Sequence, residues 1–182
     1  MQNFSLFDII GPRMVGPSSS HTAGAAKLGR MAWKIARGDV KAAELTLYGS
    51  FATTGRGHGT DKALVAGILG LAPDDARLRY SLLLAQEAGV SVDIHYSDEE
   101  PDHPNTARIR ITSAAGKVTE IVGASIGGGN IRITEINGME VELSGEYPTL
   151  IVRHTDVPGV INDVTSILAR ERINVAFISR SL

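Results

Sequence analysis

The chain has 182 residues, of which 43% are apolar and 21% charged, and its formal net charge is −2. These values are ordinary for a globular protein and give no sign of binding to nucleic acid or to an anionic membrane surface. The absence of cysteine excludes disulfides, thiol nucleophiles and cysteine-ligated clusters within this chain. No segment reaches the roughly 18 apolar residues of a membrane span, and residues 1–10 lack the regions of a signal peptide. We therefore expect a cytoplasmic protein that does not enter a membrane.

A polar segment precedes the first predicted helix, and it carries Ser18, Ser19, Ser20, His21 and Thr22. Residues 25–37 follow as a strong helix-forming run. Serine and threonine in this position are N-cap residues, so hydroxyls, an imidazole and free backbone N–H groups meet at a helix N-terminus. Such a place favours anions, including a substrate carboxylate. A good N-cap with one additional histidine explains the same residues, because a cap needs only one hydroxyl, and both interpretations remain open.

The next segments predict an α+β domain over residues 1–145, with helices and a mixed sheet. Alternation predicts a strand at 43–50, and a glycine-punctuated loop at 53–61 leads into a helix at 62–69. A third helix is expected from Pro73 to about Ala88. The remaining segments are typical of strands: 91–96, 107–113, 117–122, 131–136 and 141–143.

The tail predicts a β-α-β unit over residues 148–182. It consists of a strand at 149–154, a turn at 155–159, a helix at 160–172 and a strand at 173–179. About 35 residues is fewer than usually fold alone, so the tail packs on the first domain, pairs with another chain or begins a longer unit. Pairing of its exposed strand edge between two copies would give a homodimer.

Two other segments carry candidate site residues. His58 lies in a glycine-rich stretch, residues 55–59, whose spacing fits no nucleotide-binding fingerprint but suits a loop around a small anion. A tight turn that needs positive φ explains these glycines equally well. Asn105 ends the turn His103-Pro104-Asn105, where it either reaches a site or serves only the turn. The five histidines are scattered, and we expect no metal site in this chain.

Four motifs, in this order, resemble the beta subunit or beta domain of iron–sulfur-dependent L-serine dehydratases: residues 16–22, 55–61, 103–106 and 125–129. The resemblance covers about Phe4 to the end of the chain. Within the tail, residues 156–160 and 173–175 resemble the first half of an ACT domain, whose full unit is β-α-β-β-α-β. The resemblance implies an allosteric-substrate-binding-like domain over residues 1–145 and a partial ACT domain over residues 148–182.

The resemblance also implies an activity, a cofactor and partners. The family converts L-serine to pyruvate and ammonia with a [4Fe-4S] cluster, whose iron acts as a Lewis acid on the serine hydroxyl. The cysteines that hold the cluster belong to the alpha subunit, which agrees with the absence of cysteine here. We therefore expect this chain to be inactive alone and to work with an alpha subunit, as a homodimer or in a higher hetero-oligomer.

Roles for single residues follow from the chemistry and the resemblance together. A neutral imidazole near pH 7 is a suitable proton acceptor, so His21 is the expected catalytic residue. The expected contacts to L-serine are Ser18, Ser19, Ser20, Thr22, His58 and Asn105, with help from the helix N-terminus. Two other functions remain open: a regulatory module that binds serine or another small acid without catalysis, and a structural module that joins partners through the tail.

Overall fold

The computed structural model describes residues 13–178. Residues 1–12 and 179–182 lie outside the described part, and so does the last residue of the strand expected at 173–179. The chain divides into two compact units, Met1–Glu146 and Tyr147–Leu182, and each is described by itself. Within residues 13–178, no helix combines the length and the apolar character that crossing a membrane requires.

The first unit is built on a six-stranded sheet in the order β2-β1-β3-β4-β5-β6. β1 and β2 are parallel and every other neighbouring pair is antiparallel, so the sheet is mixed, as the sequence predicts. A parallel pair needs a long crossover, which the helices between β1 and β2 provide. The strands are β1 Ala42–Leu47, β2 Ser91–Tyr96, β3 Thr106–Thr112, β4 Val118–Gly127, β5 Asn130–Ile136 and β6 Met139–Leu143.

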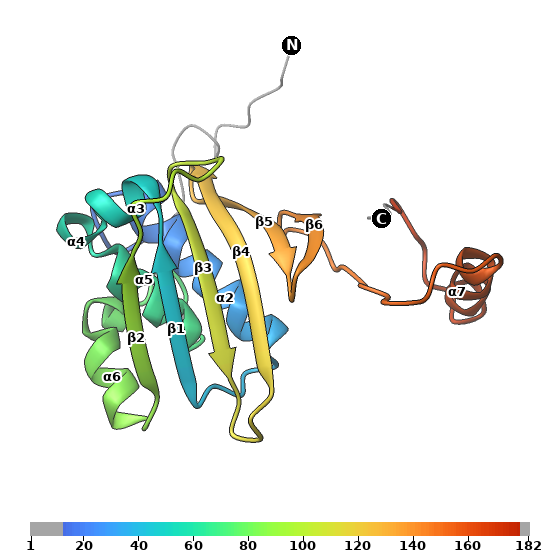
Figure 1. The fold of residues 1–182 in the computed structure, drawn as a ribbon, viewed down its shortest axis with the longest axis horizontal. Coiled ribbons are helices and arrows are strands. Elements are labelled where there is room, and N and C mark those ends of the chain that lie inside the picture. Colours follow the sequence, from blue (N-terminus) through green and yellow to red (C-terminus); the bar gives the residue numbers. More distant parts are fainter. Residues whose placement is uncertain (1–12, 179–182) are drawn as a thin grey trace, which may run out of the picture. The chain divides into compact units, whose positions relative to one another are not determined.

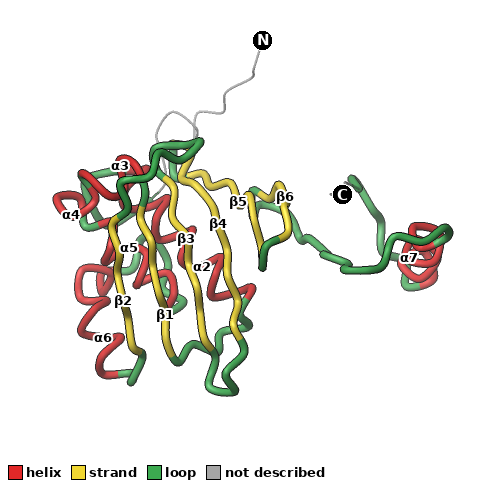
Figure 2. Tube along the Cα trace, viewed as in Figure 1, coloured by secondary structure: helices red, strands yellow, loops and turns green. Residues whose placement is uncertain are grey.

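The helices of this unit cover one face of the sheet, as Figures 1 and 2 show. They are the π-helical turn η1 Ser19–Gly24, α2 Ala25–Ile35, α3 Gly49–Thr53, α4 Gly55–His58, α5 Thr60–Ile68, the 3₁₀-helix η2 Ala76–Tyr80 and α6 Ser81–Glu87. The core lies between the helices and the sheet, because alternate strand residues such as Leu45 and Ile109 are fully buried there. α2 and α5 approach closely at Gly29 and Gly67, which have no side chains to separate them.

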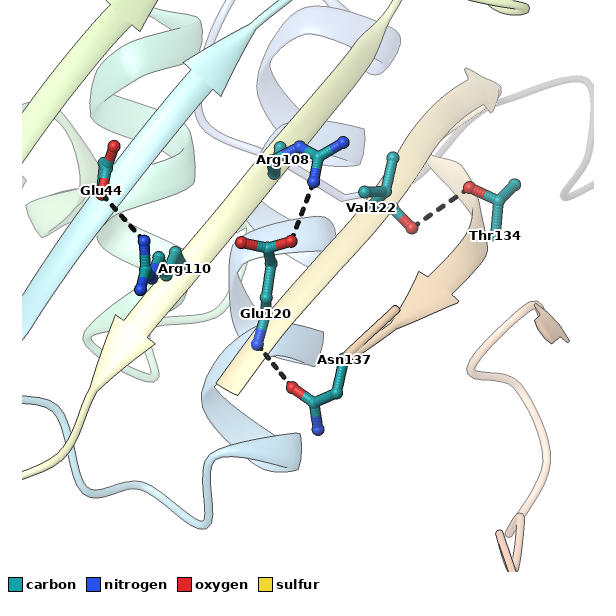
Figure 3. A network of polar contacts seen from close by, with 7 residues as sticks. All are labelled: Glu44, Arg108, Arg110, Glu120, Val122, Thr134 and Asn137. Carbon is teal, nitrogen blue, oxygen red and sulfur yellow. Dashed lines mark hydrogen bonds and ion pairs between the residues drawn. The ribbon is translucent and has the colours of Figure 1, made fainter. Parts of the chain in front are cut away.

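The other face of the sheet carries charged and polar side chains, some of them drawn in Figure 3. The guanidinium of Arg108 donates to Glu120 at 2.8 Å across β3 and β4. Arg110 lies 4.0 Å from Glu44 on β1, and the backbone N–H of Glu120 donates to Asn137 at 2.9 Å. Such cross-strand pairs support the strand register but add little stability where water reaches them.

The main differences from the sequence-based expectation in the first unit concern four segments. The strand expected at 43–50 ends at Leu47, because α3 begins at Gly49. The glycine-rich loop expected at 53–61 is mostly helical, and within residues 55–59 only Gly59 has positive φ, between α4 and α5. The helix expected at 73–88 is divided into η2 and α6. β4 continues past the expected end at 122 to Gly127 because it pairs with both β3 and β5.

The tail contains the expected helix but not the expected strands. α7 spans Val160–Arg170, and residues 149–154 and the described part of 173–179 form no strand. A strand needs a hydrogen-bonded neighbour. In a β-α-β-β-α-β unit of the split type, the two strands of one half are not adjacent to each other. An alternating apolar pattern therefore does not suffice to form a strand in the tail. Two apolar residues of the expected strands, Leu150 and Phe177, are 65% and 81% exposed.

Candidate functional site

The polar segment before α2 forms a single π-helical turn, and local hydrogen bonds explain its shape. Ser18 is extended, and its Oγ accepts from the backbone N–H of His21 at 3.0 Å, so Ser18 is the N-cap. The carbonyl oxygen of Ser18 accepts from the N–H groups of both Thr22 and Ala23, the second bond being the wider π-type. Gly16 has a φ of +135° and lies against the side chain of Thr22. π-helical turns recur at functional sites.

His21 points from this turn toward two hydroxyl groups on α3 and just after it. Its Nε2 lies 3.0 Å from the Oγ of Ser50 and 3.1 Å from the Oγ1 of Thr54. Gly49, with a φ of +53°, makes the sharp change of direction from β1 into α3, and the backbone of Pro104 packs against it. The edge of the His21 ring also meets the buried ring of Phe51, with centroids 5.4 Å apart. Contacts distant in sequence therefore fix the orientation of the imidazole.

His58 lies beside His21 at the end of α4. The two ring centroids are 4.9 Å apart with the planes tilted by 37°. The Nδ1 of His58 donates to the backbone oxygen of Thr54 at 3.1 Å, and the hydroxyl of Thr22 makes a long hydrogen bond of 3.4 Å to the backbone oxygen of His58. His58 is exposed, whereas His21 is half-buried. The structure thus brings together two histidines that are distant in the sequence.

The surroundings favour the neutral form of His21. Burial lowers the pKa of His21 below its ordinary value of 6.5, and the neighbouring His58 lowers it further. The backbone of Ser50 acts in the opposite direction. At neutral pH the imidazole is therefore uncharged and able to accept a proton.

The other residues expected to bind substrate fall into two groups. Ser18, Ser19, Ser20 and Thr22 all lie on or next to the π-helical turn, and the Thr22 side chain is buried. Asn105 lies before β3, where its amide donates to the backbone oxygen of Ser125 at 3.3 Å, and no hydrogen bond joins it to His21 within residues 13–178.

Asn105 is nevertheless linked to the π-helical turn through one residue. The buried side chain of Ser125 packs against Gly24, where a Cβ would lie 1.9 Å from the Oγ of Ser125. The Oγ of Ser125 and the Oδ1 of Asn105 are both buried without a hydrogen-bond partner. Ser125 thus lies against the end of the π-helical turn, and neither atom is among the groups that contact the His21 ring.

Ser50 and Thr54 are not among the residues expected at the site from the sequence, although both contact Nε2 of His21. The available signal is their i, i+4 spacing directly after the end of a strand, which places two hydroxyls on one face of a short helix. That spacing gives no indication of which distant side chain they meet.

The described residues do not fit an iron–sulfur cluster. The chain has no cysteine to provide thiolate ligands. Within residues 13–178, no group of three or more His, Asp or Glu side chains is arranged to hold a metal ion. A cluster that takes part in the chemistry would need ligands from another chain.

Comparison with known proteins gives consistent matches over nearly the whole sequence. Residues 3–89 match the family model described as serine dehydratase beta chain, and residues 148–179 match the ACT domain model. The chain is 46% identical to a probable L-serine dehydratase beta chain of Bacillus subtilis, over 96% of this chain and 79% of that protein. It is 43% identical to the L-serine dehydratase beta chain of Peptoniphilus asaccharolyticus, with the same coverage of 96% and 79%. It is also 29% identical to D-3-phosphoglycerate dehydrogenase of Mycobacterium leprae, over 50% of this chain and 18% of that protein.

Proposed function

Because the chain belongs to the family of serine dehydratase beta chains, we propose that it is the beta subunit of an L-serine dehydratase, which converts L-serine to pyruvate and ammonia. The identity of 46% across 96% of the chain carries this proposal. The paired histidines and the serine-rich turn support it, because they provide a base and an anion site next to each other.

The π-helical turn is suited to the carboxylate of L-serine. Within residues 13–178, the backbone N–H groups of Ser19 and Ser20 donate to no other residue, as is usual for the first turn of a helix. Together with the helix dipole, these N–H groups and the serine hydroxyls favour a carboxylate. The side chain of Thr22 is buried, and its hydroxyl donates a hydrogen bond to the backbone oxygen of His58. Thr22 therefore stabilises the turn.

His21 then serves as the base. Neutral at pH 7, it accepts the proton from Cα of the bound L-serine, while the β-hydroxyl leaves and, with one proton, becomes water. The aminoacrylate that remains takes up a proton at its methylene carbon and loses one from its nitrogen, which makes it an imine. Addition of water to the imine releases ammonia and pyruvate. Exposed His58 lies beside His21, where it provides a further polar contact for the substrate.

The cofactor and the partner belong to the proposal as well. Because this chain has no cysteine, a [4Fe-4S] cluster would be held by an alpha subunit. The name beta chain, carried by both bacterial relatives, supports such a partner. A homodimer, a higher hetero-oligomer and a cytoplasmic location stay predictions.

A regulatory function is the second candidate. Half of this chain is 29% identical to part of a D-3-phosphoglycerate dehydrogenase, an enzyme of a different name. A domain shared in this way is suited to binding a small acid at the turn of residues 18–22, with His21 as a hydrogen-bond donor. In that case, substitutions at His21 change the response to serine but leave the maximal rate intact.

The deciding experiment is co-expression of this chain with its alpha subunit under anaerobic conditions, followed by assay of pyruvate from L-serine with and without this chain. We expect activity only when both chains are present. His21→Ala should then lower kcat by about 10²- to 10⁴-fold with a small change in KM, because loss of a general base has this magnitude. The control is His95→Ala. His95 is exposed on β2, and its Nε2 lies 3.8 Å from the Oε1 of Glu44 and not beside His21. Normal kcat in His21→Ala, or full activity of the alpha chain alone, would contradict the proposed role.

A further inference from the structure

Four short polar contacts link Nε2 of His21, Ser50 and Thr54, and two of the four involve Nε2 itself. Only a limited number of protons is available to fill these contacts. Nε2 lies 3.0 Å from the Oγ of Ser50 and 3.1 Å from the Oγ1 of Thr54. The two hydroxyl oxygens are 3.2 Å apart, and the hydroxyl of Thr54 donates to the backbone oxygen of Ser50 at 2.9 Å. Each hydroxyl has one proton, and a carbonyl oxygen can only accept.

The proton count distinguishes the two neutral forms of the ring. If Nε2 has no proton, two hydroxyl protons must serve four contacts, and two of these contacts then join lone pairs. If Nε2 carries a proton, it is shared between Ser50 and Thr54. The Ser50 hydroxyl can then donate to Thr54, and the Thr54 hydroxyl donates to the carbonyl. This second arrangement fills all four contacts, whereas the first leaves two of them between lone pairs that repel each other.

We propose that Ser50 and Thr54 are positioning residues, which hold the proton of neutral His21 on Nε2 and so make Nδ1 the basic atom. This inference deepens the proposed function by naming the atom that accepts the substrate proton. Both hydroxyl contacts of the His21 ring are made at Nε2, and the backbone of Ser50 also favours the protonated ring. Nδ1, which neither hydroxyl contacts, is the nitrogen that remains to accept the substrate proton.

The neighbouring imidazole of His58 carries its proton on the other ring nitrogen. Nδ1 of His58 faces a carbonyl oxygen, that of Thr54, so it must carry a proton, and the free nitrogen of His58 is Nε2. His58 is the titratable side chain that contacts the His21 ring, and the remaining ring contact is to apolar Phe51. The two neighbouring histidines are therefore held in opposite tautomers.

The first test is nitrogen NMR of the isolated 182-residue chain with ¹⁵N-labelled histidine. The two ring nitrogens of a neutral imidazole have different chemical shifts, depending on which one carries the proton. We expect the proton of neutral His21 on Nε2. A proton on Nδ1 would overturn the inference, and because this measurement uses the unmodified chain, it decides the question even if variants fail to fold.

The second test is the sign of the change in the His21 pKa when a hydroxyl is removed. As acceptors, the hydroxyls stabilise the protonated ring, so Ser50→Ala and Thr54→Val should lower the pKa of His21. As donors to a bare Nε2, they would stabilise the neutral ring, and the same variants would raise it. A rise or no change overturns the inference. Thr54→Ser, which keeps the hydroxyl, should restore the original pKa.

The matched control is Thr53→Val. Thr53 neighbours Thr54, and its hydroxyl likewise donates to the backbone four residues earlier, to Gly49 at 3.1 Å, but it does not contact His21. We expect Thr53→Val to leave the tautomer and the pKa of His21 unchanged. A shift as large as that in Thr54→Val would mean that any change in this helix perturbs the ring, and would overturn the specific role of Thr54.

Enzyme kinetics separate this inference from the proposed function. In the two-subunit enzyme, Thr54→Val should lower kcat by up to about 100-fold with little change in KM. A misplaced base slows proton transfer but does not weaken the binding of L-serine. If His21→Ala retains kcat while NMR shows the proton on Nε2, the catalytic role fails and the positioning stands. If His21→Ala loses kcat and NMR shows the proton on Nδ1, the positioning fails and the catalytic role stands.

Discussion

Replacing Gly29 by alanine tests how tightly the crossing of α2 and α5 is determined. In a free helix this change stabilises by up to about 1 kcal/mol, because alanine loses less conformational entropy than glycine. In the folded chain, a Cβ on Gly29 would lie 2.2 Å from the backbone oxygen of Leu64 and 3.1 Å from the backbone nitrogen of Ile68. Backbone atoms cannot rotate away, so the two helices must separate and the core must repack.

Overpacking of a core costs about 1–3 kcal/mol, occasionally more, and a backbone contact belongs at the upper end of that range. We therefore expect Gly29→Ala to lower the free energy of unfolding by about 2 kcal/mol after the gain in helix propensity is counted. For a unit of this size, that loss corresponds to a fall in Tm of about 4–8 °C. Circular dichroism during urea and thermal denaturation measures both quantities.

The control is the same substitution at Gly57 on α4, where a Cβ would meet no atom within 4 Å. Gly57→Ala should leave the protein as stable as before, or slightly more stable. A Gly29→Ala protein with unchanged stability would refute the reasoning, as would equal losses in both variants. α2 continues from the turn that carries His21, and α5 follows the segment that carries His58, so Gly29→Ala should also lower kcat in the two-subunit enzyme.

Three further predictions concern the dependence of stability on pH, the buried ring of Phe51 and an ion pair on the outer face of the sheet. Because folding lowers the pKa of His21 below 6.5, the unfolded chain binds a proton before the folded chain does as the pH falls. The free energy of unfolding should therefore decrease as the pH falls below 6.5. Urea denaturation at several pH values should show a shallower decrease for His21→Asn than for the unmodified chain. An equal dependence on pH in the two proteins would contradict the lowered pKa of His21. Phe51→Ala removes a fully buried ring beneath His21 and should cost about 3–5 kcal/mol in urea denaturation, whereas a cost below about 1 kcal/mol would mean that the ring is not packed. Glu120→Gln weakens the partly exposed pair with Arg108 and should change the free energy of unfolding by less than about 1 kcal/mol; a larger loss would show that this pair stabilises the sheet strongly.

The sequence by itself determined the type and order of most elements in the first unit. Alternating apolar residues predict the strands, because successive side chains point to opposite faces, and the helix after Gly24 follows from propensity and capping. The motifs also indicate the family, which the matches over nearly the whole chain confirm. His21 and His58 were selected as candidates from their own segments, and the structure places their rings next to each other.

Only the tertiary structure decided which groups complete the surroundings of His21. Ser50 and Thr54 reach Nε2 because the segment that follows β1 lies against His21, and no local pattern records a contact across 29 or 33 residues. The tail differs from the prediction for the same reason. Its apolar pattern predicts strands, but a strand needs a hydrogen-bonded neighbour, and none forms in the described part of the tail. Local propensity acts within a few residues along the chain. The partners of a side chain, or of a strand edge, depend on which distant segments pack against it.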